Sequence, residues 1–324
     1  MQRGLPNPEP EDGETMVHTP VLPEETLRLL QPAPGATAVD CTLGMGGHAS
    51  LLLEAIQPGG WLIGFDRDPD ALRRAGERLA RFGRAFRPMH ADYRTIAGSL
   101  RAAGALPVDL ILADLGVSSA QMLDPTRGFS FASDAPLDMR LDPSSGAETA
   151  EALLARLDET GLARLLRDLG EEPQARAIAR AIVRERASSP VRSTARLAEI
   201  VVRAARFQGR SRIHPATRTF MALRIAVNDE LRGLEAFVED AVSCLRPGGR
   251  IAVISFHSLE DRPVKTALRR LAAGCVCPPD LPACACGRTA AVRLVSRRAI
   301  RPSAAEIAQN PRASSARLRV AERL

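Results

Sequence analysis

The stretch AVDCTLGMGGHASLLLEAI, at residues 38–56, decides the fold class of this chain. Apolar residues of strand length come first, three glycines follow within four positions, and a leucine-rich helical pattern closes the stretch. A strand, a tight glycine turn and a helix N-terminus let a ligand approach the backbone closely and meet free N–H groups. We therefore expect a nucleotide-type site around Gly44, Gly46 and Gly47.

Carboxylates near this corner narrow the choice of ligand. Asp66 lies twenty residues after Gly46, where an acid commonly binds a ribose hydroxyl pair. Residues 44–49 fit the G-x-G-x-x-G/A dinucleotide pattern, which makes NAD a candidate. Asp40 and Asp114 both end predicted strands, and carboxylates there would repel a pyrophosphate but attract the cationic head and sulfonium of S-adenosylmethionine. We favour S-adenosylmethionine, with an NAD-dependent dehydrogenase as the alternative.

Strand-like and helical runs alternate through the first third of the chain. The run at 107–116 is apolar on both faces, as in a buried parallel strand. This rhythm predicts an α/β protein with a doubly wound, mostly parallel, Rossmann-like sheet. The predicted strands are 36–43, 60–68, 85–92 and 107–116, and the predicted helices are 48–56, 69–82 and 93–104.

The alternation stops near residue 124. A polar, turn-rich segment and then a series of helical patterns follow, with no convincing strand before residue 230. The strand signal returns at 247–258 and in two late runs, at 291–298 and 316–323. We therefore predict a sheet domain interrupted by an all-helical insertion. The predicted parts are a disordered tail at 1–16, a cofactor-binding domain at 17–124 and 231–324, and the insertion at 125–230.

Arginine is concentrated in the insertion. Residues 176–224 hold twelve arginines, no lysine and two glutamates, in a chain of net charge +6. Guanidinium groups match phosphate oxygens bidentately, so we expect a nucleic-acid partner, with Arg210 and Arg212 as candidate RNA contacts. A non-catalytic RNA-binding protein would also explain this charge. No apolar run approaches the ~20 residues of a membrane span, and the N-terminal segment lacks the apolar core of a secretory signal, so we expect a cytoplasmic protein with no membrane contact.

Four cysteines form a separate cluster. Cys275, Cys277, Cys284 and Cys286 follow the spacing C-x-C-x6-C-x-C. Four thiolates on a short Pro-rich loop can bind zinc tetrahedrally, although the more usual zinc spacing is C-x2-C. We treat a structural zinc site as one interpretation and a reduced, metal-free loop as the other.

Eight longer motifs follow one another along the chain: HTPVLPEE (18–25), TLGMGGH (42–48), DRDP (66–69), DLGVSS (114–119), RGFSF (127–131), PLDMR (136–140), HPATRTFMALRIAVNDEL (214–231) and SFHSLEDR (255–262). The longest of them are highly specific, and so is their order. Together they resemble the MraW/RsmH family of ribosomal RNA methyltransferases, and the similarity runs from about residue 18 to the C-terminus.

The resemblance implies a class I, S-adenosylmethionine-dependent methyltransferase fold with an inserted helical domain. It implies methylation of the exocyclic N(4) of a cytosine in the decoding region of 16S ribosomal RNA. It further implies the small ribosomal subunit as partner, with no DNA. The cofactor contacts it implies are Gly46, Gly47, His48, Asp66, Tyr93, Asp114 and Gln121.

Two residues are candidates for the chemical step. Asp114 follows the fourth predicted strand, where it could hold the cofactor, accept from the substrate amine, or do both. His257 follows the next strand and could accept the released proton. The Pro-Pro-aromatic motif that many amino-methyltransferases carry after this strand is replaced here by DLGVSS, so their mechanism does not transfer directly.

Overall fold

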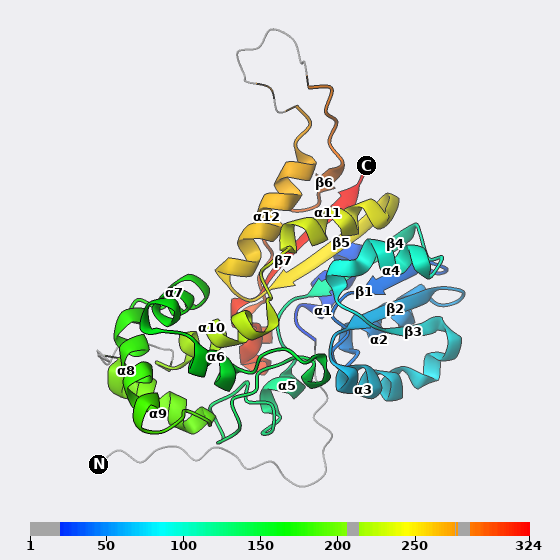
Figure 1. Ribbon diagram of the computed structural model, residues 1–324. Coiled ribbons are helices and arrows are strands. Elements are labelled where there is room, and N and C mark those ends of the chain that lie inside the picture. Colours follow the sequence, from blue (N-terminus) through cyan, green and yellow to red (C-terminus); the bar gives the residue numbers. More distant parts are fainter. Residues whose placement is uncertain (1–19, 206–213, 276, 278–285) are drawn as a thin grey trace.

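The computed structural model describes residues 20–205, 214–275, 277 and 286–324. A single seven-stranded sheet with strand order β3-β2-β1-β4-β5-β7-β6 lies at its centre (Figure 1). The first five strands in chain order run parallel, whereas β7 is antiparallel to both of its neighbours. The strands are β1 (Thr37–Asp40), β2 (Trp61–Asp66), β3 (Phe86–His90), β4 (Val108–Asp114), β5 (Leu245–Ser255), β6 (Val292–Leu294) and β7 (Arg317–Arg323).

Helices cover both faces of the sheet, which explains why the central strands are apolar on both sides. One hydrophobic cluster joins the sheet to α4 (Ile96–Ala102), α11 (Leu234–Cys244) and α12 (Ser258–Ala272). A second cluster, on the other face, joins it to α1 (Pro23–Leu30), α2 (Gly47–Ile56) and α3 (Pro69–Leu79). The expected doubly wound α/β fold is confirmed.

The helices between β4 and α11 form a third hydrophobic cluster of their own. Figure 1 shows them gathered to one side of the sheet. Helices α7 and α10 pack on each other, as do α7 and α8, and α8 and α9. These helices are α5 (Ser119–Leu123), α6 (Ala150–Arg156), α7 (Glu159–Gly170), α8 (Ala175–Ser188), α9 (Thr194–Ala204) and α10 (Thr217–Asn228).

Most differences from the predicted elements lie at their ends. The expected helix at 93–104 divides into a 3₁₀ turn, Tyr93–Thr95, and α4, because the Asp92 carboxylate accepts from the Arg94 backbone N–H and starts a short turn. The short helix α5 was not expected. It begins at a capping box in which Ser118 and Gln121 satisfy each other's backbone N–H groups.

Some expectations concern other parts of the chain. The predicted tail at 1–16 lies outside the described residues. The two late runs form β6 and β7, and a further short helix, α13 (Ala304–Gln309), precedes the last strand. Among the helices of the described residues, none has both the length and the apolar character needed to span a membrane.

Candidate functional site

A cavity of about 660 Å³ opens at the carboxyl edge of the sheet. The last residues of β1, β2 and β4, which are Asp40, Asp66 and Asp114, all line it. In an open α/β sheet this edge, at the point where the strand order reverses, is where ligands bind. Other parts of the cavity wall come from the glycine loop, from helix α10, and from a 3₁₀ turn at Pro311–Ser315.

The glycine loop is closed against Asp66. The backbone N–H of Gly44 donates to Asp66 Oδ2 at 2.8 Å, and the N–H of Asp68 donates to Asp66 Oδ1 at 2.8 Å. Gly47 lines the cavity as expected, but Gly46 does not. Gly46 caps α2 with a φ of 72°, and a Cβ there would meet Leu79 Cδ1 at 3.2 Å. The loop needs Gly46 for its left-handed turn and for packing on α3, so a direct cofactor contact from it stays a prediction.

The three strand-end carboxylates lie close enough to influence one another, with Asp40 buried and Asp66 and Asp114 half-buried. Burial raises the pKa of Asp40 to about 7, and the charge of Asp66 adds to the rise. Burial likewise raises the pKa of Asp66 to about 6, although backbone N–H donors oppose it. Burial raises the pKa of Asp114 well above its ordinary value, and the charges of Asp40 and Glu260 contribute. A positively charged ligand would stabilise the ionised form of all three carboxyls and so lower their pKa values.

Asp114 combines burial with unused hydrogen-bonding capacity. Its Oδ1 atom has no hydrogen-bond partner among the described residues. Its Oδ2 atom lies 3.8 Å from Nε2 of His48, which lines the same cavity. The backbone N–H of Asp114 donates to Thr42 Oγ1 at 2.6 Å, which fixes the end of β4 beside the glycine loop. The structure thus brings His48 and Asp114 together at the cavity, and their contact with a cofactor stays a prediction.

The remaining predicted cofactor residues also line the cavity. The Tyr93 ring packs edge-to-face on Phe237, with 4.6 Å between ring centroids, and burial raises the pKa of its hydroxyl. Gln121 is buried and already engaged: its Nε2 donates to Asp68 Oδ2 at 2.9 Å, and its Oε1 accepts from the Ser118 N–H. Gln121 is therefore held in place to shape the wall, and its contact with a cofactor stays a prediction.

His257 does not line the cavity itself, but Glu260 does. The His257 Nε2 atom lies 3.1 Å from Glu260 Oε1, and the Phe256 N–H donates to Glu260 Oε2 at 2.8 Å. Arg224 makes a two-pronged contact with Glu230, at 3.0 and 2.9 Å. Burial alone would raise the pKa of Glu260, but His257 and Arg224 lower it below its usual value.

Sequence reasoning missed Glu260, Arg224 and Glu230 as site residues. Glu260 follows His257 by three positions at the start of α12, a spacing that places both on one helix face. That spacing, directly after a buried strand, was the available signal. Arg224 and Glu230 come from α10 and the turn after it, and only the tertiary structure brings them to the sheet edge.

A buried ion pair joins the insertion to the sheet domain. Arg127 Nη1 lies 3.0 Å from Asp68 Oδ2, and Arg127 Nη2 donates to the carbonyls of Arg140 and Leu141. Nearby, the Asn228 side chain donates to the Met139 carbonyl at 2.7 Å. These contacts attach the motifs RGFSF and PLDMR to the segment after β2 and to the end of α10.

The predicted RNA contacts Arg210 and Arg212 lie outside the described residues. Four other arginines line the cavity, and three of them are paired with carboxylates: Arg67, Arg94 and Arg224. The fourth, Arg312, is exposed and has no ion-pair partner in the described part of the chain.

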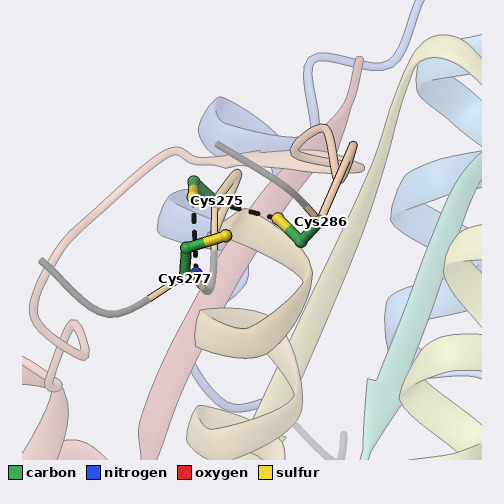
Figure 2. Close-up of side chains that lie close together, drawn as sticks. All are labelled: Cys275, Cys277 and Cys286. Carbon is green, nitrogen blue, oxygen red and sulfur yellow. Dashed lines mark hydrogen bonds between the residues drawn. The ribbon is translucent and has the colours of Figure 1, made fainter. Parts of the chain in front are cut away.

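Three of the four clustered cysteines are described, and Cys284 is not. Cys275, Cys277 and Cys286 bring their sulfur atoms to within 4.8 Å of one another (Figure 2). None of them lines the cavity. The other two cysteines, Cys41 and Cys244, are buried in the core.

Comparison with known proteins agrees with these features. The model of the MraW methylase family matches residues 15–324. The chain is 54% identical over 308 residues to the ribosomal RNA small subunit methyltransferase H of Anaeromyxobacter sp. (strain K), covering 95% of this chain and 98% of that protein. It is 52% identical over 311 residues to the enzyme of the same name from Geobacter sulfurreducens, covering 96% and 100%.

Among solved structures, a putative rRNA-methylase from Clostridium thermocellum aligns with a TM-score of 0.42 and 12% identity, over 94% of this chain and 97% of that one. The sequence relatives carry the assignment. A family of methylases leaves the dehydrogenase and the non-catalytic RNA-binding protein without support. The strand-end carboxylates, the glycine loop and the full-length match agree: this chain belongs to the MraW methylase family.

Proposed function

We propose that this protein methylates the exocyclic N(4) of a cytosine in the decoding region of 16S ribosomal RNA, with S-adenosylmethionine as methyl donor. The family and the names of its relatives support a methyltransferase for small-subunit ribosomal RNA. The observation that carries the choice of site is the buried Asp114 Oδ1, which has no partner in the described residues and lies at the edge that Asp40 and Asp66 also reach.

The carboxylates that line the cavity fit S-adenosylmethionine better than a dinucleotide. When bound, S-adenosylmethionine supplies an electrophilic methyl group on a cationic sulfur. Asp40 and Asp114 would offset its positive charges, whereas a pyrophosphate would meet three carboxylates at the same edge. Asp66 is held by two backbone N–H groups and would accept from the ribose hydroxyls. The Tyr93 ring, fixed by Phe237, would form a wall for the adenine.

Asp114 is the proposed proton acceptor. The amine of cytosine is a weak nucleophile because its lone pair is delocalised into the ring. Asp114 Oδ1 would accept a hydrogen bond from that amine, help the nitrogen become tetrahedral, and hold the proton that leaves after transfer. Burial raises the pKa of Asp114 in the ligand-free protein, and the cationic cofactor would lower it and keep the carboxylate ionised to accept. His257 would act through Glu260, by keeping that second carboxylate charged and oriented beside the cavity.

The helical insertion, at 125–230, is the proposed RNA-binding domain, because it carries the arginine-rich segment at 176–224 and contributes Thr217 and Arg224 to the cavity wall. Across the cavity, the exposed guanidinium of Arg312 would contact a phosphate next to the target nucleotide. The target base must leave its stack to enter such a pocket. Ribosomal RNA as the substrate would place the protein in the cytoplasm.

The direct test is methyl transfer from isotope-labelled S-adenosylmethionine to purified small subunits that lack the modification. We expect one labelled N(4)-methylcytidine, identified by nuclease digestion and mass spectrometry. Label on another base or another atom would contradict the proposed target. A thermal-shift comparison should show stabilisation by S-adenosylmethionine and none by NAD.

The role of Arg312 has its own test. Arg312→Ala should weaken binding of the small subunit and reduce its dependence on salt concentration by about one counterion, because one phosphate contact is lost. Arg301→Ala is the matched control, since Arg301 is also exposed but does not line the cavity. Equal effects of the two substitutions would mean that Arg312 contributes only to overall charge.

A further inference from the structure

Three cysteine thiols converge where the chain leaves helix α12 and returns toward β6. The Sγ atoms of Cys275 and Cys286 lie 3.8 Å apart, and the candidate ligand atoms of these two residues and Cys277 all lie within 4.8 Å of one another. Figure 2 shows the three side chains gathered beyond the last turn of the helix. Cys275 and Cys286 are exposed and Cys277 is half-buried, so the cluster is not part of a hydrophobic core.

The spacing between the sulfur atoms excludes a disulfide and is compatible both with a thiol hydrogen bond and with a shared metal ion. A disulfide would bring two sulfurs to about 2.05 Å. Thiolates at about 2.3 Å from a tetrahedral zinc ion lie about 3.8 Å from each other. The 3.8 Å between Cys275 and Cys286 matches the edge of such a tetrahedron. We propose that Cys275, Cys277 and Cys286 bind one zinc ion.

The surroundings suit a thiolate site. The backbone N–H of Cys277 donates to Cys275 Sγ at 3.4 Å, a contact that stabilises the charged form of the sulfur. Three thiolates around one divalent ion leave a net negative charge. Arg288, two residues after Cys286, is exposed and lies near this charge in sequence, whereas the guanidinium of Arg270 is paired with Glu235 and Glu239.

The ion would have a structural role. None of the three cysteines lines the cavity that holds Asp114, so the zinc would lie apart from the proposed methyl transfer. Cys275 follows the end of α12 by three residues, and Cys286 precedes the start of β6 by six. Bridging them would fix these two chain positions against each other, and because the unfolded chain has no preformed site, the binding free energy of the ion would stabilise the folded state.

Metal analysis of the full-length protein tests this proposal. Protein purified without chelator should contain about one zinc ion per chain by inductively coupled plasma mass spectrometry. The double variant Cys275→Ser/Cys286→Ser should contain less than about a tenth of that, because two of the three ligands are lost. Cys244→Ala is the matched control, since Cys244 is a buried core residue far from the cluster in sequence, and it should keep its zinc.

A second measurement on the unaltered protein does not depend on the variants folding. Cobalt substituted for zinc should give the strong thiolate-to-cobalt charge-transfer absorption of a sulfur-rich tetrahedral site. The proposal is overturned if the intact protein takes up neither metal, if the double variant retains full zinc, or if mass spectrometry without reductant finds a disulfide between Cys275 and Cys286.

Discussion

At the edge of the sheet, Asp40 and Asp66 have pKa values of about 7 and about 6, both raised from 3.8 mainly by burial. Between 3.8 and these values the folded chain holds more protons than the unfolded chain. The stability that this proton binding contributes is therefore fully present below pH 3.8 and is lost as the pH rises through the folded-state pKa values. These two carboxyls therefore lower the stability of the ligand-free protein near neutral pH, and a bound cation would offset that loss.

This linkage predicts how Asp40→Asn changes the pH profile. The asparagine carries no charge at any pH, so the variant should gain stability relative to the unaltered chain as the pH rises from about 4 to about 7, and the difference should be constant above that. Denaturant unfolding at a series of pH values gives the difference between the two curves. Asp240→Asn, which changes an exposed carboxylate on α11, is the control for removing one surface carboxylate. A flat difference for Asp40→Asn would show that its carboxyl has an ordinary pKa.

The same carboxyl predicts a pH dependence of cofactor binding. The proposed role of Asp40 requires its carboxyl to be ionised, and a group with a pKa of about 7 is mostly protonated at about pH 6. Affinity measured by calorimetry should therefore rise about tenfold between about pH 6 and pH 8, with protons released on binding. In Asp40→Asn the affinity should be weaker and its pH dependence smaller than in the unaltered protein, with the remainder coming from Asp66 and Asp114. A pH-independent affinity in the unaltered protein would argue that Asp40 stays ionised throughout.

Asp114 has a more specific expected effect. Asp114→Asn preserves shape but removes the negative charge and the ability to take a proton. The rate of methyl transfer should fall about 10²- to 10³-fold, the usual loss for one electrostatic group in an active site. Stability should rise or stay unchanged, because the raised pKa of Asp114 reflects a buried charge. A rate within about threefold of the unaltered enzyme, measured beside Asp240→Asn, would remove Asp114 from the chemical step.

At the scale of the elements, the glycine loop and helix α2 depend on Gly46. Its φ of 72° favours glycine, and a Cβ would come within 3.2 Å of Leu79. Gly46→Ala should therefore cost about 1–2 kcal/mol of unfolding free energy. Gly76→Ala, inside α3, is the matched control: a Cβ added there would meet no atom within 4 Å beyond its own helix backbone, and alanine should stabilise by about 0.5–1 kcal/mol. Urea unfolding separates the two, and a loss in both variants would contradict the backbone argument.

The strands that end at the cavity could be predicted from the sequence, whereas part of the cavity wall could not. Strands β1, β2 and β4 were predictable because each is a mostly apolar run that ends in an aspartate. Parallel strands place their carboxyl ends at the same edge of the sheet, so these aspartates were expected to lie together. The cavity wall contributed by Arg224 and Arg312 was not predictable in the same way. Arg224 reaches Glu230 within a helical insertion, and Arg312 lies in a turn almost 250 residues after Asp66, so only tertiary packing places them at one site.

At the scale of the whole molecule, two hydrophobic units meet through polar contacts. The insertion has its own apolar cluster, separate from the two that flank the sheet. Arg127 crosses to Asp68, and Arg67 crosses in the other direction to the Asn228 carbonyl at 2.8 Å. Residues from both sets of helices and from the sheet edge line the cavity, so these links help to set its shape.

The ion pair between Arg127 and Asp68 predicts a large loss of unfolding free energy when Arg127 is substituted. Their side chains are only 12% and 2% exposed, so Arg127→Met would leave the Asp68 carboxylate buried without its cation. Removing one partner of a buried pair typically costs about 3–5 kcal/mol. Arg156→Met is the matched control, because Arg156 pairs with Glu148 at the surface, with 61% and 36% of the side chains exposed, where the expected cost is at most about 1 kcal/mol. Chemical unfolding measures the free energy of unfolding of both variants. Comparable losses in the two would show that the ion pair of Arg127 with Asp68 contributes no more to stability than a surface pair does.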